Sequence, residues 1–119
     1  NKKNLESSQD YIISELENLG DEYTRLSTDL SESKSLSIDK KILDIFQEIN
    51  EFFSRFHKFY YNFSNKEAVE MVNIKNKINK KINSIKTGNK EESALSFHLN
   101  KIVHLITNIG ERVIMMKLL

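Results

Sequence analysis

Three histidines are the residues of this chain best suited to acid–base or metal chemistry. They are His57, His98 and His104. His98 and His104 lie six residues apart, whereas two ligands on one face of a helix are spaced by three or four. The chain has no cysteine, which excludes thiolate metal sites, thiol nucleophiles and disulfides. We therefore expect three histidines at the surface or rim of the fold, and no metal site.

Acidic residues occur in three close pairs: Asp21 with Glu22, Glu91 with Glu92, and Glu15 with Glu17. A catalytic carboxylate has to be desolvated in a cleft, whereas we expect these pairs at helix starts or on solvated faces. The three glycines are far apart, so no phosphate-binding loop is present. The sequence thus predicts no catalytic residue, no cofactor and no small-molecule substrate.

His98 and Lys101 form an H-x-x-K pair that is similar to the start of the motif in histidine phosphotransfer domains. Those domains are four-helix bundles with an exposed reactive imidazole, and the resemblance implies that role for His98. It covers little more than this pair. Ile102, an apolar seam residue, stands where the motif has glycine, so only His98 is carried over and we still predict that the protein is not an enzyme.

Length and composition limit the fold that positions these residues. With 119 residues the chain has the size of one domain. Proline is absent and glycine occurs only 3 times, which disfavours an all-β fold with many tight turns. The 18 basic residues nearly balance the 17 acidic ones, which argues against a strongly basic nucleic-acid-binding domain. No apolar run approaches the ~20 residues of a membrane span.

Apolar residues recur with a period of seven in four blocks, which is typical of packed helices. In the first block Leu5, Ile12, Leu19 and Leu26 follow this spacing. The second block contains most of the phenylalanines, on a face three positions wide. The pattern predicts helices over residues 4–32, 37–63, 65–87 and 90–118.

Capping residues mark the predicted helix boundaries. Ser64 with Glu67 matches a capping box, and Asn89 with Glu92 gives a second N-terminal cap. Gly88 follows the last apolar residue of the third block, as a C-terminal glycine does. Without a break at residues 63–65, the second and third blocks would form one rod ~75 Å long, which would overhang its partners.

Four helices joined by short loops predict an all-α fold, an antiparallel up-down-up-down four-helix bundle, with a single domain over residues 1–119. Short loops make sequential helices antiparallel neighbours. We therefore expect the second helix to lie beside the first.

The fourth helix has more apolar residues than one seam requires. We predict that the surplus forms a partner interface, with contact residues Phe97, Leu105, Ile114, Met115 and Leu118. The alternative is that this helix is central in the bundle and buries these side chains itself.

The segment from residue 73 to residue 90 contains lysines and no acidic residue. A basic helix of this kind can bind nucleic acid or an anionic membrane surface. The candidate anion-binding residues are Lys75, Lys77, Lys80, Lys81 and Lys86. The segment has no arginine and no interleaved aromatic residue, so we favour a solvated helix facing acidic neighbours and keep anion binding as the less favoured alternative.

We predict a non-enzymatic protein–protein interaction module that acts through helix packing. Its partner is another protein or a second copy of itself, in a homodimer. It is either an assembly or adaptor subunit or the exposed helical domain of a surface or secreted protein whose leader preceded Asn1, and the sequence leaves the compartment open. Tyr60 and Tyr61, close to His57 and Lys58, form an aromatic and basic rim for which bundle-end packing and a secondary contact both remain open.

Overall fold

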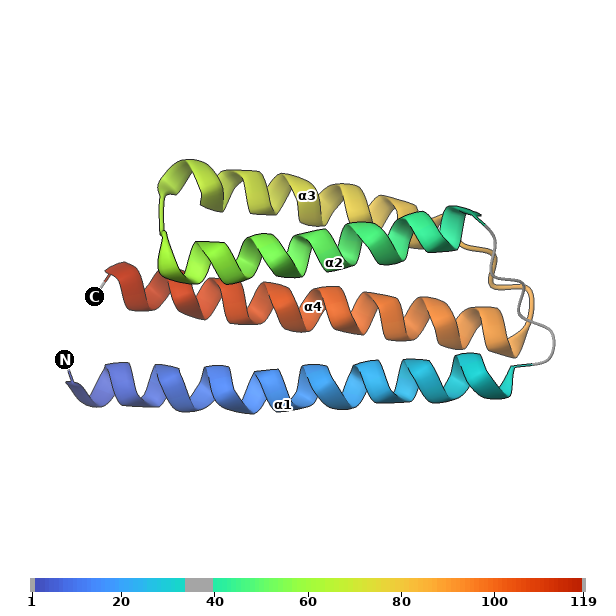
Figure 1. Ribbon diagram of the computed structural model, residues 1–119, viewed down its shortest axis with the longest axis horizontal. Helices are drawn as coiled ribbons and strands as arrows, with labels where there is room; N and C mark the ends of the chain where they lie inside the picture. The colour runs from blue at the N-terminus through green and yellow to red at the C-terminus, as the bar shows by residue number, and fades with distance from the viewer. Residues whose placement is uncertain (1, 34–39, 119) are drawn as a thin grey trace.

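The computed structural model of the protein describes residues 2–33 and 40–118. Within these ranges it consists of four α-helices, which are α1 (Lys2–Glu32), α2 (Lys40–Tyr61), α3 (Asn65–Asn83) and α4 (Lys90–Leu118) (Figure 1). Consecutive helices run in opposite directions along a body of 51 × 26 × 18 Å. The predicted all-α, up-down four-helix bundle is confirmed. The predicted start of the second helix at residue 37 lies outside the described residues.

Two N-terminal caps form as the sequence predicts. The backbone N–H of Glu67 donates to Ser64 Oγ at 3.1 Å, and the backbone N–H of Glu92 donates to Asn89 Oδ1 at 2.8 Å. Each bond satisfies a donor that has no partner inside its helix. The chain therefore turns between α2 and α3, and the alternative of one continuous rod is wrong.

The C-terminal ends of α2 and α3 come earlier than the sequence suggests. α2 ends at Tyr61 rather than 63, and α3 ends at Asn83 rather than 87. The Ser84 hydroxyl donates to the Lys81 carbonyl at 2.6 Å, and Lys41 of α2 donates to the Ser84 carbonyl at 3.0 Å. These bonds satisfy carbonyls of the last turn four residues before Gly88, which has no positive φ. The prediction of Gly88 as the terminating glycine is wrong.

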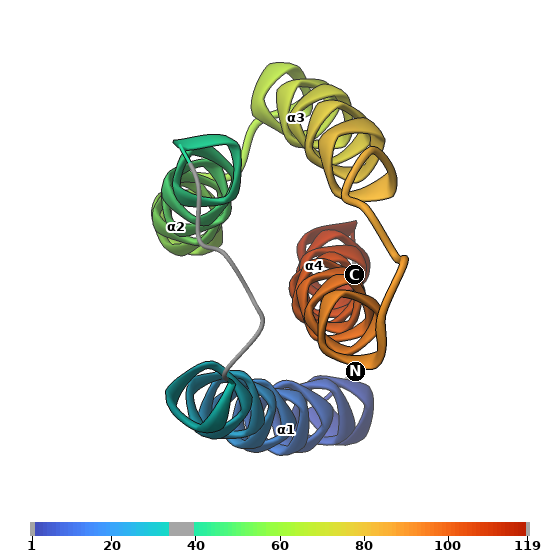
Figure 2. The ribbon, with the colours of Figure 1, turned by 90° about the vertical axis from the view of Figure 1, so that its right-hand side faces the viewer.

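Helix α4 is the central element of the bundle. It contacts all three other helices, with α1 on one side and the α2–α3 hairpin on the other (Figure 2). In the described residues no Cα atom of α1 lies within 8 Å of one in α2. The expectation that these sequential helices pack as neighbours is wrong, because each of them packs on α4 instead. The central position of α4 accounts for its long apolar surface, which is buried at Leu95, Leu99, Ile102, Val103, Leu105, Ile106, Ile109 and Val113.

The core between α4 and the hairpin is built by the phenylalanine-rich α2. Phe52, Phe56 and Phe59 are buried, and they follow one another by three or four residues on a single face of the helix. Of the residues of α3, only Met71, Ile78 and Ile82 are buried, so this shorter helix is an outer element of the bundle. The side of α2 that faces α1 is much less enclosed.

Candidate interaction surfaces

The contact residues predicted on α4 do not form one surface. Phe97, Met115 and Leu118 are exposed, with Phe97 at 63%, whereas Leu105 is only 4% exposed and Ile114 packs partly against the core. Leu105 is buried because α4 is central, so its prediction as an exposed contact residue is wrong. The 18 residues from Phe97 to Met115 correspond to ~27 Å of helix. The exposed face between them is polar, with Lys101, His104, Asn108 and Glu111.

The predicted anion-binding lysines point in different directions around α3. Lys81 forms an ion pair with Glu48 of α2 at 2.5 Å, and Lys75 is half-buried on the side of α4. Lys77, Lys80 and Lys86 are exposed. The acidic helix α1, which we expected opposite this segment, has no backbone contact with α3 in the described residues. The lysines therefore do not converge on one phosphate-binding face.

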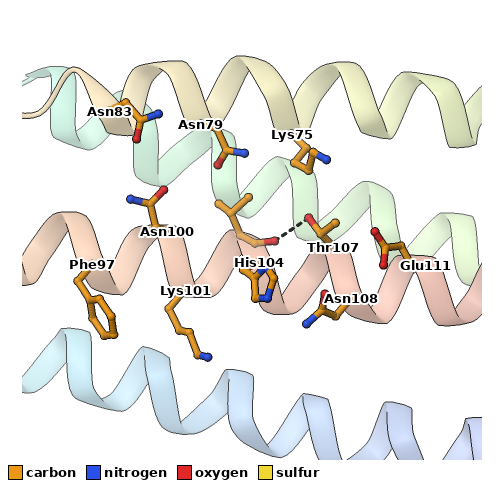
Figure 3. Close-up of a pocket in the computed structure, with 11 residues that line it drawn as sticks. Lys75, Asn79, Asn83, Phe97, Asn100, Lys101, His104, Thr107, Asn108 and Glu111 are labelled. Carbon is orange, nitrogen blue, oxygen red and sulfur yellow. Dashed lines mark hydrogen bonds between the residues drawn. The ribbon is translucent and has the colours of Figure 1, made fainter.

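A polar groove lies between α3 and α4 (Figure 3). It has a volume of about 620 Å³ and is broadly open to solvent. Figure 3 shows Asn79 and Asn83 of α3 opposite Asn100 of α4, whereas Phe97 and Lys101 extend from α4 on the side away from α3. These groups can donate and accept hydrogen bonds to a polar ligand. The groove contains no pair of groups arranged as a nucleophile and its base in the part of the chain that the structure describes.

A second groove, between α1 and α2, is lined mostly by apolar and aromatic side chains. Its volume is about 430 Å³. α1 contributes Ile12, Ile13 and Leu16, and α2 contributes Phe53, Phe56, His57, Tyr60 and Tyr61. Ile13 is 57% exposed, Leu16 41% and Tyr61 69%. We call this feature the α1–α2 groove.

The α1–α2 groove follows from how α1 packs. Ser8, Leu19, Glu22 and Leu26 bury one face of α1, which lies against α4. Leu16 lies on the adjacent face, which points toward α2. Because α2 is not close enough to cover that face, Leu16 and the adjoining Ile13 stay open to solvent, whereas Ile12, Leu19 and Leu26 are buried. The aromatic rim predicted at Tyr60 and Tyr61 forms the opposite wall of this groove.

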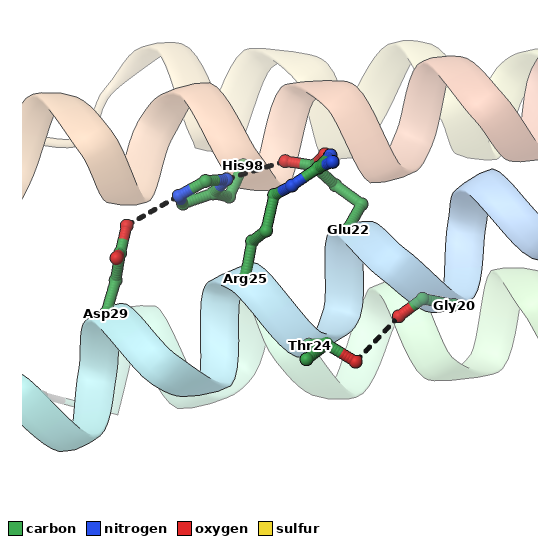
Figure 4. A network of polar contacts seen from close by, with 6 residues as sticks. All are labelled: Gly20, Glu22, Thr24, Arg25, Asp29 and His98. Atoms are coloured by element: carbon green, nitrogen blue, oxygen red, sulfur yellow. Dashed lines mark hydrogen bonds and ion pairs between the residues drawn. The ribbon is translucent and has the colours of Figure 1, made fainter.

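A buried polar network joins α1 to α4 (Figure 4). His98 Nδ1 lies 2.6 Å from Glu22 Oε1, and His98 Nε2 lies 2.6 Å from Asp29 Oδ2. Arg25 donates to the second oxygen of Glu22 at 3.0 Å. Glu22 is only 2% exposed and His98 9%. The expectations that His98 lies at the surface and that Glu22 lies on a solvated face are both wrong.

Two carboxylates facing the two ring nitrogens stabilise the protonated imidazole. Burial of the ring acts to lower the pKa of His98, but the hydrogen bonds to Glu22 and Asp29 and the charges of these carboxylates outweigh it. The pKa of His98 is therefore raised above its ordinary value of 6.5. In the protonated ring both nitrogens donate and neither has a free lone pair, and the burial of His98 means that the exposed imidazole implied by the phosphotransfer resemblance is not present.

The network is not arranged as a metal site. Its two carboxylates bind opposite sides of the ring and do not converge on one point. Elsewhere in the described ranges there is likewise no group of three or more metal-ligating side chains. Of the helices in those ranges, none combines the length and the apolar character needed to cross a membrane.

Compared with known protein families, with curated proteins and with solved structures, the chain matches none.

Sequence reasoning missed the polar network and the α1 wall of the groove. One pattern was available, because Ser8, Glu15, Glu22 and Asp29 are spaced by seven, beside the apolar seam. Ser8 and Glu22 of this row are buried on the same face of α1 as Leu19 and Leu26. The partner, His98, lies 76 residues from Glu22 along the chain, so no local pattern connects the two.

Proposed function

We propose that the protein is a non-enzymatic interaction module that binds a helix of another protein in the α1–α2 groove. One observation carries this proposal: α1 has an apolar face that no helix of the described chain covers, opposite a wall of aromatic side chains. On the surface of a monomeric domain, a contiguous exposed apolar groove is more often a binding site than a feature without function.

The mechanism is the insertion of an amphipathic helix into a groove, with side chains spaced by three and four residues as anchors. Ile13 and Leu16 supply aliphatic surface on one wall and Tyr61 an aromatic ring on the other. Covering a side chain of this size contributes about 1.5–3 kcal/mol, and several are needed to offset the cost of association. Tyrosine is also enriched among residues that dominate binding energy.

The α1–α2 groove supports the proposal better than the face of α4 on which the sequence prediction rested. Phe97 and Met115 are separated by polar residues, whereas the groove residues are contiguous across two helices. Phe97, Met115 and Leu118 remain predicted contacts for a further partner. The partner in the groove is proposed to be another protein; a second copy of the chain is the competing occupant.

A selection experiment tests the proposal without a known partner. Peptides selected from a library of amphipathic helices should bind the protein, and Leu16→Gln should abolish most of this binding. Val69→Gln is the matched control, because Val69 is an exposed apolar residue of α3, at 61%. Binders that are indifferent to Leu16→Gln, or equally sensitive to Val69→Gln, would refute a binding site in the groove.

Light scattering over a hundredfold concentration range complements the selection. We expect a monomer whose groove is vacant. A dimer that Leu16→Gln dissociates would mean that a second copy fills the groove, and the proposal of a foreign partner would then be wrong.

A further inference from the structure

The two rims of the α1–α2 groove differ in charge. On α1, Ile13 lines the groove, and its neighbours on the outer surface of the helix are the residues three before and four after it, Asp10 and Glu17. Glu6, one heptad before Ile13, extends the same row. All three carboxylates are exposed, and none forms an ion pair within residues 2–33 and 40–118. The α1 rim is therefore acidic along Glu6, Asp10 and Glu17, with Lys3 at its N-terminal end.

The α2 rim has no such charge. The residues three and four away from Phe53, which lines the groove, are Ile49, Asn50, Phe56 and His57. Only His57 among them is ionisable, and its ring packs edge-on against a tyrosine at 5.3 Å between centroids.

Two of the four cations of α2 are engaged with α3, whereas Lys58, three residues before the groove-lining Tyr61, is exposed and adds a positive charge near the end of the α2 rim. Arg55 binds Glu67 of α3 through two hydrogen bonds, at 3.0 and 3.2 Å, and Lys41 donates to the carbonyl of Ser84. These basic groups are therefore engaged with the α3 side and do not neutralise the α1 rim.

We infer that the α1–α2 groove binds an amphipathic helix of a partner whose apolar stripe is flanked, on one side only, by lysine or arginine. This inference rests on the proposed function and adds the chemistry of the partner. The basic flank lies along Asp10 and Glu17, and the flank without basic residues lies along the aromatic wall of α2, beside Lys58. Charge complementarity at a rim sets the orientation of the bound helix and accelerates association, and it is weakened by salt.

The test uses three synthetic peptides of about 20 residues, long enough to form a helix on binding. They share one leucine stripe and differ on a single flank, which is Lys, Gln or Glu. Binding to the full chain is measured by fluorescence anisotropy at low and at physiological ionic strength. We expect the Lys peptide to bind about fivefold more tightly than the Glu peptide at low salt, with a smaller ratio at physiological salt.

Charge reversal locates the effect. Asp10→Lys with Glu17→Lys should invert the order of the Lys and Glu peptides. Asp44→Lys with Glu70→Lys is the matched control, because it changes the net charge equally at exposed positions of α2 and α3. If the control inverts the order as well, the preference comes from net charge and the inference is overturned.

Two further outcomes separate this inference from the proposed function. Equal binding of the three peptides that is lost with Leu16→Gln would leave the groove as the binding site and overturn the basic partner. Binding that survives Leu16→Gln would overturn both. Circular dichroism verifies that the variant is folded, and Ile13→Gln, at a 57% exposed position, replaces it if it is not.

Discussion

Replacing His98 by leucine tests whether the buried polar network fixes α1 on α4. His98 lies between Glu22 and Asp29, with both ring nitrogens 2.6 Å from a carboxylate oxygen. Leucine preserves much of the packing volume but removes both hydrogen bonds and the positive charge. The variant leaves Glu22, whose side chain is 3% exposed, with Arg25 as its remaining ion-pair partner in the described chain.

The loss of unfolding free energy in each variant follows from how deeply the remaining charged group is buried. Removing one member of a buried ion pair costs about 3–5 kcal/mol, because the other charge stays buried. Arg25 still binds Glu22, so we expect the low end of that range, about 3 kcal/mol, for His98→Leu. The side chain of Asp29 is 48% exposed, and its loss in Asp29→Ala should cost under about 1 kcal/mol. A loss of 3 kcal/mol is a large part of the stability of an ordinary domain.

A double variant separates the network from simple packing. Glu22→Met together with His98→Leu removes the buried carboxylate as well as its partner. Since no charge then remains buried without its partner, the double variant should be more stable than His98→Leu alone, by at least about 1 kcal/mol. A double variant whose loss equals the sum of the single losses would show that the two side chains act independently.

The pH dependence has a defined sign. The fold raises the pKa of His98 above 6.5, since the two carboxylates favour the protonated ring despite its burial. The contribution to stability is therefore complete below about pH 6.5 and is lost as the pH rises through the raised folded pKa. Wild type should lose stability between pH 6 and pH 9, and His98→Leu should lose less over the same range.

Urea unfolding followed by circular dichroism at pH 6 and pH 9 measures the free energy of unfolding of wild type and of each variant, and how it changes with pH. His57→Gln and His104→Gln are the controls, because each removes an exposed histidine that lies outside the network. A loss below about 1 kcal/mol for His98→Leu at pH 6, with the same pH dependence as wild type, would refute the role of the charged ring.

Five further variants test the packing of individual helices by thermal unfolding. Gly110→Ala should stabilise the protein by about 0.5–1 kcal/mol, since the added Cβ would lie 3.9 Å from a phenylalanine carbon, an ordinary contact, and a lower melting temperature would show that α4 is packed more tightly there. Gly20→Ala should act in the same direction, because nothing lies within 4 Å of its added Cβ, and an unchanged stability would contradict a helical position 20. Ser64→Ala should cost about 1 kcal/mol by removing the N-cap of α3, and no loss would mean that this cap is dispensable. Ile106→Ala should cost about 2–5 kcal/mol, whereas Phe97→Ala, at a 63% exposed position, should cost under about 1 kcal/mol, and equal losses would contradict the central place of α4.

The sequence predicts what depends on local periodicity and capping. Four helices, the turn at Ser64 and the cap at Asn89 follow from residues close together in the chain. The seam of α4 follows in the same way, because an uninterrupted spacing of three and four has to face a core. The end of α3 was less predictable, since Lys41 of another helix helps to satisfy its last carbonyls.

The candidate sites depend on which helices touch, and periodicity does not contain that information. A heptad pattern identifies the buried face of α1 but not whether α4 or α2 covers it. As a general rule, two helices joined by a short loop pack side by side. The rule predicts that α2 covers α1, and for this pair the prediction is wrong. Leu105 was assigned to the surface for the same reason, because the number of helices around α4 is a property of the assembled bundle.

The polar network and the α1–α2 groove both follow from the orientation of α1 about its own axis. Glu22 and Leu16 are six residues apart, so at 3.6 residues per turn their side chains point about 120° away from each other around the helix. When the network holds Glu22 against α4, Leu16 and Ile13 are directed to the side that α2 leaves uncovered. An apolar seam alone would allow α1 to turn until more of its leucines were buried. The contact between Glu22 and its partner on α4, His98, opposes that rotation, since turning α1 would break it. Glu22 and His98, which place a charge in the interior of the bundle, thus also keep the α1 wall of the groove exposed.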